Sequence, residues 1–379
     1  MSKGVGGLEG IVVADVTTSF VDGAEGKLIY GGYRIEDLAE NALFEEVIYL
    51  LWHNTLPNSQ ELEELRTQIA CGAALPTSVI NMMKTLPRQS NPMAVLRTAV
   101  SSLSHYYPES ENLTDRHIAL EKAIRLTGQI TTIVASWTRI RKGLDAIAPR
   151  VDLTLAENFL WMMTGKTPDK IAAAAINVYL VLLAEHGMNA STFASRVVTA
   201  TGSDMHSAIV GAIGTLKGPL HGGANTEAMK MFQEIGSAAN VKPWFDREVK
   251  EHGRRLMGIG HRVYKAPDPR AAVLKKHAQA LAKSSGNTRW YDIADQLEEV
   301  VLADQYFIDR QLFPNVDYYS AIALYTLGLD IDMFTPLFAM ARIAGWAAHV
   351  VSQMGGRLIR PKANYVGPMD LPWRPVAKR

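Results

Sequence analysis

Apolar stretches introduced by helix-capping residues dominate the chain. The pairs Asn91-Pro92 and Thr335-Pro336 and the triplet 167–169 (Thr-Pro-Asp) each precede such a stretch. Capping side chains accept hydrogen bonds from free backbone N–H groups, and proline suits the first helical position. The stretch after the triplet, 171–185, is rich in Ala and Leu, and Gly187 is well placed to end its helix. We expect further helices at 36–54, 59–72, 93–103, 114–142, 153–163, 204–215, 224–235, 269–284, 288–303, 315–327 and 337–354.

Strand signals are few and short. Residues 10–14 and 27–30 are apolar runs that could pair as a small N-terminal ribbon. Strands do not alternate with helices, and neither a GxGxxG nor a Walker A sequence is present. The sequence therefore predicts an all-α fold. Because no repeat, low-complexity tract or flexible linker occurs, any second domain is expected to be an insertion.

Length and charge narrow the class of protein. A chain of 379 residues with 47% hydrophobic residues suits two domains with a sizeable core. The net charge of +1 gives no overall field that would attract nucleic acid or an acidic membrane, so an anionic ligand needs a local basic cluster. The longest apolar run, 171–184, is interrupted by Asn177 and is shorter than the about 18–20 residues of a membrane span.

The N-terminus and the cysteine content point to a reducing compartment. The first seven residues contain no apolar core of a secretory signal, so we expect a cytoplasmic protein. Cys71 is the only cysteine, which excludes an intramolecular disulfide and any multi-cysteine metal site. With no activating residue beside it, Cys71 is expected to be a small buried hydrophobe.

Four segments place ionisable residues beside glycine or proline, where backbone shape is forced. They contain His186, His221, His261 and Asp317. Each alone has an ordinary structural interpretation, but four together favour a site. The three histidines lie 35 and 40 residues apart with no HExxH pair, so we expect no metal. A serine hydrolase is disfavoured because no G-x-S-x-G elbow is present.

These residue types suit carbon–carbon bond formation through an enol. Asp317, near the start of a helix, would be kept ionised by the helix dipole and could remove a proton next to a thioester carbonyl. His221, beside a glycine turn, is the candidate donor to the enolate oxygen, and His261 the donor to the electrophilic carbonyl. A dicarboxylate substrate would need guanidinium groups that bind carboxylates in a bidentate manner.

Two basic features support an anionic ligand. Arg342 lies inside an otherwise apolar helix, where a guanidinium needs a partner such as a ligand carboxylate. One dense basic stretch in the nearly neutral chain suits the phosphates of an anionic ligand, although a solvated helix face fits Lys275 and Lys276 better than Lys265. The stretch consists of Arg254, Arg255, Arg262, Lys265, Arg270, Lys275 and Lys276.

Several long motifs in this order closely resemble the citrate synthases of the short bacterial and archaeal type. The motifs are 216–224 (LKGPLHGGA), 257–265 (MGIGHRVYK), 268–270 (DPR) and 314–317 (PNVD). The likeness starts at 7–10 (GLEG) and 32–35 (GYRI) and ends at 365–368 (YVGP). The closely related 2-methylcitrate synthases share the same motifs. The family often has His-Pro-Met where this chain has Asn91-Pro92-Met93, which leaves any contact of that histidine in doubt here.

The resemblance implies a role for each matching residue. His221 would stabilise the enol of the acyl-CoA, Asp317 would remove the proton, and His261 would polarise and protonate the oxaloacetate carbonyl. His186, Arg270 and Arg342 would hold oxaloacetate, and Arg360 would reach the active site of the neighbouring subunit of a homodimer. The expected coenzyme A contacts are Gly258, Ile259, Gly260, Lys265, Arg262 and Arg357.

The resemblance also implies an architecture and a reaction. Residues 1–223 and 329–379 would form a large helical domain, and 224–328 a smaller inserted domain that closes over oxaloacetate. The reaction would join acetyl-CoA to oxaloacetate and hydrolyse citryl-CoA, with no permanently bound cofactor. Two alternatives stay open: a 2-methylcitrate synthase that uses propionyl-CoA, alone or besides acetyl-CoA, and a non-catalytic helical scaffold dimer.

Overall fold

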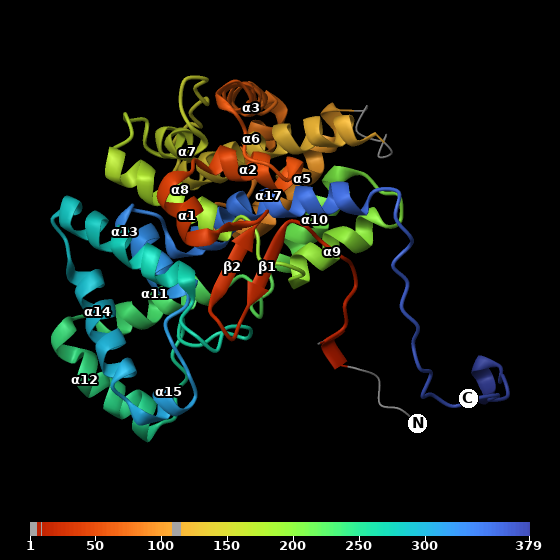
Figure 1. The fold of residues 1–379 in the computed structure, drawn as a ribbon. Helices are drawn as coiled ribbons and strands as arrows, with labels where there is room; N and C mark the ends of the chain where they lie inside the picture. The colour runs from red at the N-terminus through yellow and green to blue at the C-terminus, as the bar shows by residue number, and fades with distance from the viewer. Residues whose placement is uncertain (1–5, 9, 108–114) are drawn as a thin grey trace.

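Helices form nearly all of the regular structure. The structure, a computed structural model, describes residues 6–8, 10–107 and 115–379, and Figure 1 shows a small antiparallel sheet at the lower edge of the main group of helices. The all-α prediction is confirmed. The first half of the chain contains α1 (Ile35–Asn41), α2 (Phe44–His53), α3 (Ser59–Gly72), α4 (Thr77–Thr85), α5 (Pro92–Leu103), α6 (Arg116–Ile140), α7 (Leu155–Thr164) and α8 (Lys170–Leu183). The second half contains α9 (Ala190–Thr199), α10 (Met205–Leu216), α11 (Ala224–Ile235), α12 (Val241–Trp244), a π-helix (Phe245–Glu251), α13 (Pro269–Ser285), α14 (Arg289–Leu302), α15 (Gln305–Asp309), α16 (Val316–Thr326) and α17 (Phe334–Gln353).

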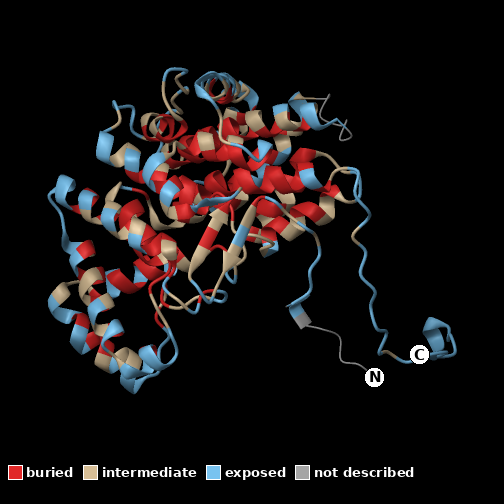
Figure 2. Ribbon diagram, in the orientation of Figure 1, coloured by how far each residue is buried: buried red, intermediate tan, exposed pale blue. Residues whose placement is uncertain are grey.

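Helix α17 forms the centre of the core. It packs against α2, α6, α8, α9 and α10, and Figure 2 shows it as an almost continuously buried helix. A helix that is apolar on all sides is stable only when neighbours cover every face. The stretch Ile331–Gln353 is also long and apolar enough to cross a membrane, but 89% of its most apolar window is buried inside the fold. Its composition is therefore that of a core helix.

A second group of helices lies to one side of α17. Helix α13 packs against α16, α14 and α8, and α11 packs against α16. Figure 1 shows α11, α12, α14 and α15 together at the lower left, away from the helices that surround α17. Helix α16 lies between α11, α13 and α14, so its N-terminus, which bears Asp317, is fixed by neighbours from this group.

The N-terminal sheet has a different first strand from the one we expected. β1 (Ser19–Asp22) pairs in antiparallel fashion with β2 (Lys27–Tyr30), and β3 (Tyr33–Arg34) pairs with β2. The strand predicted at 27–30 is confirmed, but 10–14 form no strand. An apolar run pairs only where a partner edge is within reach, and that edge of β2 is occupied by β1. Ile11 and Val12 are instead exposed.

Each predicted helical stretch contains a helix, most with ends that differ for local reasons, whereas α4, α9, α12 and α15 were not predicted. The predicted helix 36–54 is divided at Ala42, which is extended. Helix α8 begins after Asp169, whose carboxylate accepts hydrogen bonds from the backbone of the first turn, so Asp169 and not Thr167 is the cap. Cys71 is exposed, contrary to expectation. Residue 114, where another helix was predicted to begin, lies outside the described ranges.

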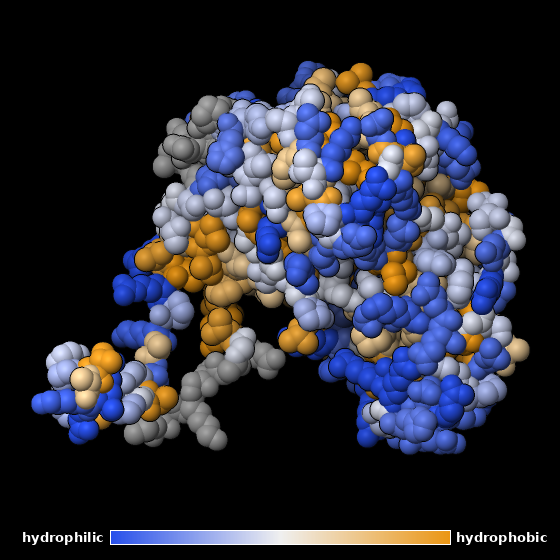
Figure 3. Space-filling view, turned by 180° about the vertical axis from the view of Figure 1, so that it is seen from behind, coloured by the Kyte–Doolittle hydropathy of each residue, from blue (hydrophilic) through white to orange (hydrophobic). Residues whose placement is uncertain are grey.

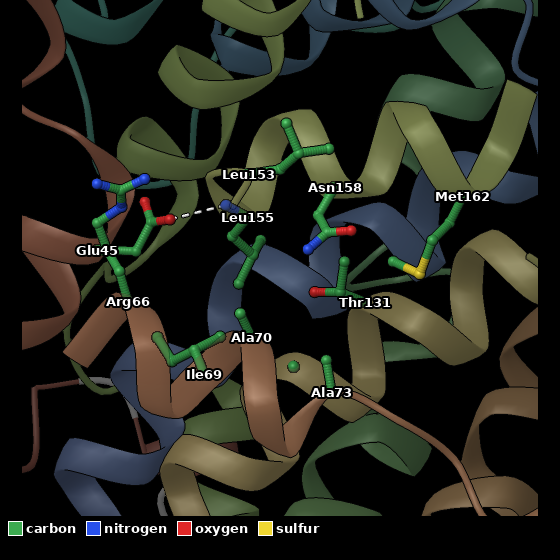
Figure 4. A pocket seen from close by; sticks show the side chains of 11 residues that line it. Glu45, Arg66, Ile69, Ala70, Ala73, Thr131, Leu153, Leu155, Asn158 and Met162 are labelled. Carbon is green, nitrogen blue, oxygen red and sulfur yellow. Dashed lines mark hydrogen bonds between the residues drawn. The ribbon is translucent and has the colours of Figure 1, made fainter. Parts of the chain in front are cut away.

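A small pocket lies between α2, α3, α6 and α7 (Figure 4). Glu45 on its wall accepts a hydrogen bond from Leu155 N at 2.7 Å, and burial raises the pKa of Glu45. The second oxygen of Glu45 and Nε of Arg66 are buried there without partners. None of the expected site residues lines this pocket, so it is a polar gap in the core and not a candidate site.

Helix α3 offers a test of the capping argument. Asn58 Oδ1 accepts from Gln60 N at 2.9 Å and Glu61 N at 3.0 Å, while Glu61 Oε2 accepts from Asn58 N at 2.8 Å. Replacing Asn58 with Ala should lower the free energy of unfolding by about 1 kcal/mol, because an N-cap to Ala change typically costs that much. Asn58→Asp keeps the accepting oxygen and is the matched control. Equal urea midpoints for the two variants would contradict the assignment.

Candidate active site

His186 lies in the loop between α8 and α9, and the residues on both sides of it are tied down. Glu185 Oε1 accepts from Gly187 N at 2.7 Å and also from His349 Nε2 at 3.1 Å. The hydroxyl of Tyr30 donates to the carbonyl of Glu185 at 2.6 Å. The Nε2 atom of His186 lies 3.2 Å from the Tyr264 hydroxyl. Burial, aided by two nearby guanidinium groups, holds the pKa of His186 well below its usual value, so the ring is neutral.

His221 lies in the turn between α10 and α11. Its Nε2 accepts from Ser191 N at 3.3 Å and lies 2.8 Å from the Ser191 hydroxyl, which itself accepts from Trp346 Nε1 at 3.0 Å. Because a backbone N–H can only donate, the proton of the neutral His221 ring belongs on Nδ1. Burial and the charge of Arg342 lower the pKa of His221 to about 4. His221 is therefore a neutral donor through Nδ1.

His261 has the opposite tautomer. Its Nδ1 accepts from the backbone N–H groups of Val263 and Tyr264, both at 3.1 Å. The proton of the neutral ring therefore lies on Nε2. Burial and the charge of Arg270 lower the pKa of His261 to about 4. The ring centroids of His261 and His186 are 5.5 Å apart, so the two loops meet at this point.

Asp317 lies in the first turn of α16, whose start is tied to the 258–260 turn. Asn315 N donates to the Gly258 carbonyl at 2.9 Å, and Asn315 Nδ2 donates to the Gly260 carbonyl at 2.7 Å. Burial raises the pKa of Asp317 to about 6, although nearby guanidinium groups act in the opposite direction. The expectation from the helix dipole alone was therefore incomplete, because desolvation outweighs it. The carboxylate is still mostly ionised at neutral pH.

Two buried arginines supply positive charge to the site. Arg270 forms a bidentate pair with Asp268, with Nε–Oδ1 at 2.9 Å and Nη2–Oδ2 at 2.8 Å. Arg342 is only 2% exposed, donates from Nε to the Leu183 carbonyl at 2.7 Å, and has no ion pair with any carboxylate of the described chain. Burial lowers the pKa of Arg342. An unpaired buried guanidinium is costly, so this position is suited to an anionic ligand.

The fold brings together most of the expected residues. Arg342 acts electrostatically on His186, His221 and Asp317, and Arg270 acts on His186, His261 and Asp317. Segments from four distant parts of the chain thus share one charged environment. The chemistry available there is one base, two neutral donors and two guanidinium groups.

The expected coenzyme A contacts differ in exposure: the 258–260 turn is largely buried, whereas the basic side chains that follow it are exposed. Gly258 and Gly260 have φ of 77° and 83°, values that favour glycine, and a Cβ on Gly258 would come 3.0 Å from Tyr318 Cα. Ile259 between them is buried and forms a bridge with Pro314. Arg262 and Lys265 are exposed on the following loop.

Arg357 and Arg360 do not join the site of their own chain. Both are exposed in the extended segment after α17, which Figure 1 shows leaving the body of the molecule. Their side chains are thus free to contact something other than their own chain.

Sequence reasoning missed three supporting residues. Ser191 fixes the tautomer of His221, Tyr264 contacts His186, and Asp268 orients Arg270 while also accepting from Val316 N at 3.1 Å. Asp268 and Tyr264 stand inside motifs already singled out, but their partners are distant in sequence. Only the fold shows which loop each one meets.

Other parts of the described chain offer no competing centre. Within residues 6–8, 10–107 and 115–379, no three His, Cys, Asp or Glu side chains gather so as to hold a metal ion. A groove of about 730 Å³ lies between α1, α8 and α13, but none of the expected catalytic, oxaloacetate-binding or coenzyme A-binding residues lines it. The cluster around Arg342 is therefore the best candidate, on the strength of its charges and hydrogen bonds.

Comparison with known proteins decides the family. The family model described as "Citrate synthase, C-terminal domain" matches residues 7–362. The chain belongs to the citrate synthase family. It is 46% identical over 375 residues to citrate synthase 2 of Bacillus subtilis, covering 98% of each chain. It is 39% identical over 362 residues to a 2-methylcitrate synthase of Mycobacterium tuberculosis, covering 95% of this chain and 90% of that one. A solved structure of citrate synthase from Thermoplasma acidophilum, in a ternary complex with carboxymethyl coenzyme A and oxaloacetate, superposes with a TM-score of 0.91 at 36% identity and covers 98% of each chain.

The tautomers can be tested directly. Neutron diffraction from crystals at pH 7 should show a single deuterium on each ring, on Nδ1 of His221 and on Nε2 of His261. Both rings have a pKa of about 4 and each has a backbone N–H pointing at its other nitrogen. Exposed His117, for comparison, has no such backbone constraint in the described chain. A doubly protonated His221 or His261 would contradict the assignment.

Proposed function

We propose that the protein is a citrate synthase, which condenses acetyl-CoA with oxaloacetate and hydrolyses citryl-CoA to citrate and coenzyme A. The observation that supports this proposal is that Arg342 lies near enough to act on His221 and Asp317, and Arg270 near enough to act on His261 and Asp317. Membership of the citrate synthase family supports the same reaction.

Oxaloacetate would bind first, between the two arginines. Arg342 lacks an ionic partner and can take one carboxylate, while Arg270 is held in place by Asp268 and presents its remaining N–H groups. His186, neutral and fixed on both sides, adds a hydrogen bond. The related Thermoplasma acidophilum enzyme was solved with oxaloacetate bound, which supports this assignment.

Condensation then needs one base and two donors. Asp317 removes a proton from the acetyl methyl group, and Nδ1–H of His221 donates to the developing enolate oxygen. The enol carbon attacks the ketone carbon of oxaloacetate, and Nε2–H of His261 gives its proton to the ketone oxygen, which becomes the hydroxyl of citryl-CoA. Overall one proton passes from the acetyl methyl group to the hydroxyl, and Asp317 and His261 return to their starting states by proton exchange with water. Water then cleaves the thioester to give citrate and coenzyme A.

Coenzyme A would lie along the loop that contains His261. The peptide groups of Gly258, Ile259 and Gly260 would contact the adenine, and the exposed side chains of Arg262 and Lys265 could meet phosphates. Arg357 is a further candidate contact from the C-terminal segment. Gly258 and Ile259 are buried and the carbonyls of Gly258 and Gly260 accept from Asn315, so this contact is proposed from the family resemblance and would use the remaining peptide groups of the turn.

Domain closure and a homodimer complete the proposal. We assign 1–223 and 329–379 to the large domain and 224–328 to the small one, so that closure on oxaloacetate assembles the acyl-CoA site. Arg360 would enter the site of the neighbouring subunit. Support comes from the exposed apolar residues of the terminal segments, of which Val366 and Trp373 are 90% and 77% exposed. Figure 3 shows apolar side chains gathered on the face from which these segments leave the molecule. The cytoplasmic location stays a prediction.

Two alternatives to a citrate synthase were left open by the sequence, one catalytic and one not. A 2-methylcitrate synthase would use the same residues with propionyl-CoA, and one extra methylene changes binding by only about 1–3 kcal/mol. It is not favoured, because the 2-methylcitrate synthase relative has the lower identity. A non-catalytic scaffold would not need an unpaired buried Arg342 beside a base and two donors.

A thiol-release assay distinguishes these functions. With oxaloacetate present, acetyl-CoA should give the higher kcat/KM and propionyl-CoA a lower one, because a pocket fitted to a methyl group accommodates the extra methylene poorly. The measurement is release of free coenzyme A under each condition, and omission of oxaloacetate is the control. A preference for propionyl-CoA would establish the alternative, and no release from either thioester would leave only the scaffold.

A substitution tests the base. Asp317→Asn should reduce turnover at least about 100-fold, because general-base catalysis contributes about 10²–10⁴, while oxaloacetate affinity measured by calorimetry changes little. In the unaltered enzyme, kcat/KM should fall as the pH drops below about 6, since burial raises the pKa of the required carboxylate to that value. Exposed Asp309→Asn is the control. Activity of Asp317→Asn within about tenfold of the original would show that another group takes the proton.

A further inference from the structure

The β1–β2 hairpin contacts two of the three histidine-bearing loops of the site, those of His186 and His261. Its two strands, Ser19–Asp22 and Lys27–Tyr30, are four residues each, and so span about 13 Å. Figure 1 shows the hairpin projecting away from the helices around α17. Its base meets the loop that contains His186, and its tip meets the loop that contains His261.

The base of the hairpin fixes the backbone on both sides of His186. The Ser19 hydroxyl donates to Glu185 Oε1 at 3.0 Å and accepts from Gly187 N at 3.1 Å. The Tyr30 hydroxyl lies 3.2 Å from Glu185 N, which donates to it, and 2.6 Å from the Glu185 carbonyl. Neither Ser19 nor Tyr30 belongs to any of the four motifs.

The tip of the hairpin fixes the loop after His261. The Gly23 carbonyl accepts from Lys265 N at 2.7 Å, and a Cβ on Gly23 would lie 2.1 Å from the Val263 carbonyl oxygen. The N–H groups of Val263 and Tyr264 are the donors that orient the His261 ring. The Val263 carbonyl that Gly23 approaches belongs to the same peptide group as the Tyr264 N–H, which donates to His261. Contact with Gly23 therefore bears directly on the hydrogen bonds that set the position of His261.

We propose that the β1–β2 hairpin is a positioning element of the active site, which through Ser19, Gly23 and Tyr30 sets the spacing of the His186 loop and the His261 loop in the arrangement that binds oxaloacetate. The proposal rests on the proposed function, because the two histidines would contact opposite parts of one oxaloacetate molecule. Position 23 requires glycine because the backbone there lies against the Val263 carbonyl, and not because its φ is unusual. Any side chain there would push the two loops apart.

Gly23→Ala in the full-length chain tests the proposal. The added methyl cannot remain 2.1 Å from a carbonyl oxygen, so the His261 loop must move by about 1 Å. Misplacement of a reacting group by that distance can cost about 100-fold in rate. We expect kcat to fall 30- to 100-fold, with the oxaloacetate dissociation constant from calorimetry within about threefold and the thermal midpoint little changed. The neighbouring exposed Ala24→Ser adds one atom towards solvent and should have no effect.

Ser19→Ala tests the other end of the hairpin. Loss of the hydroxyl frees Gly187 N and one contact of Glu185, so the dissociation constant for oxaloacetate should rise about tenfold, with a smaller change in kcat. Thr17→Ala, which removes a surface hydrogen bond to Asn54, is the matched control. This variant decides the question should Gly23→Ala fail to fold.

The outcomes separate the two proposals. An unaltered enzyme without turnover refutes the proposed function. An active enzyme whose Gly23→Ala variant keeps the original kcat refutes the role of the hairpin, as does an unchanged oxaloacetate affinity in Ser19→Ala. Parallel losses of kcat, affinity and thermal midpoint in either variant would show general destabilisation and would also refute it.

Discussion

The buried positive charge of Arg342 is the constraint on which the rest of the site depends. Burying an ion costs several kcal/mol unless a partner compensates for it, and the described chain provides the carbonyl of Leu183 at 2.7 Å, the face of the Phe338 ring and the charge of Glu185, which forms no ion pair with it. The same charge lowers the pKa of His221 and of His186 and opposes the effect of burial on Asp317. The guanidinium of Arg342, which has no ion pair, therefore favours the neutral rings of His186 and His221 and the ionised form of Asp317. It also favours the binding of an anionic ligand.

Backbone hydrogen bonds fix the orientation of most of the other side chains in the site. The rings of His221 and His261 each accept from a main-chain N–H, and the start of α16 is tied to the 258–260 turn by Asn315. A side chain fixed in this way keeps its orientation without needing a charged partner. Such preorganisation costs nothing at the moment of reaction, which is when stabilisation of developing charge matters.

The sequence predicts those features that depend on local chemistry. The predicted helices 59–72 and 224–235 match α3 and α11, since their ends are set by residues within a few positions. The same holds for the cap at Asn91, whose side chain accepts from Met93 N and Ala94 N. Distant partners were not predictable. Strand 19–22 is short and half polar, and it becomes a strand because β2 offers an edge.

The candidate site shows the same division. The motifs identified His221, His261 and Asp317, because turn glycines and a helix start are visible in sequence. Ser191 was not identified, since its role depends on a contact with a ring 30 residues away. The pKa of Asp317 illustrates a competition of effects: the helix dipole is a local property, but desolvation depends on what the whole fold packs around the carboxylate.

Neutral histidines imply a particular kind of catalysis. With a pKa of about 4, neither His221 nor His261 is an imidazolium at neutral pH, so in the proposed reaction neither would bring a full positive charge to the reacting oxygen. A neutral N–H is a weak acid. The stabilisation that it gives to a developing negative charge therefore depends on its position relative to that charge. Rate must then depend on the position of the two rings more than on acid strength. A fold that fixes each ring through its backbone, and that spans the loops of His186 and His261 with a hairpin, meets this requirement.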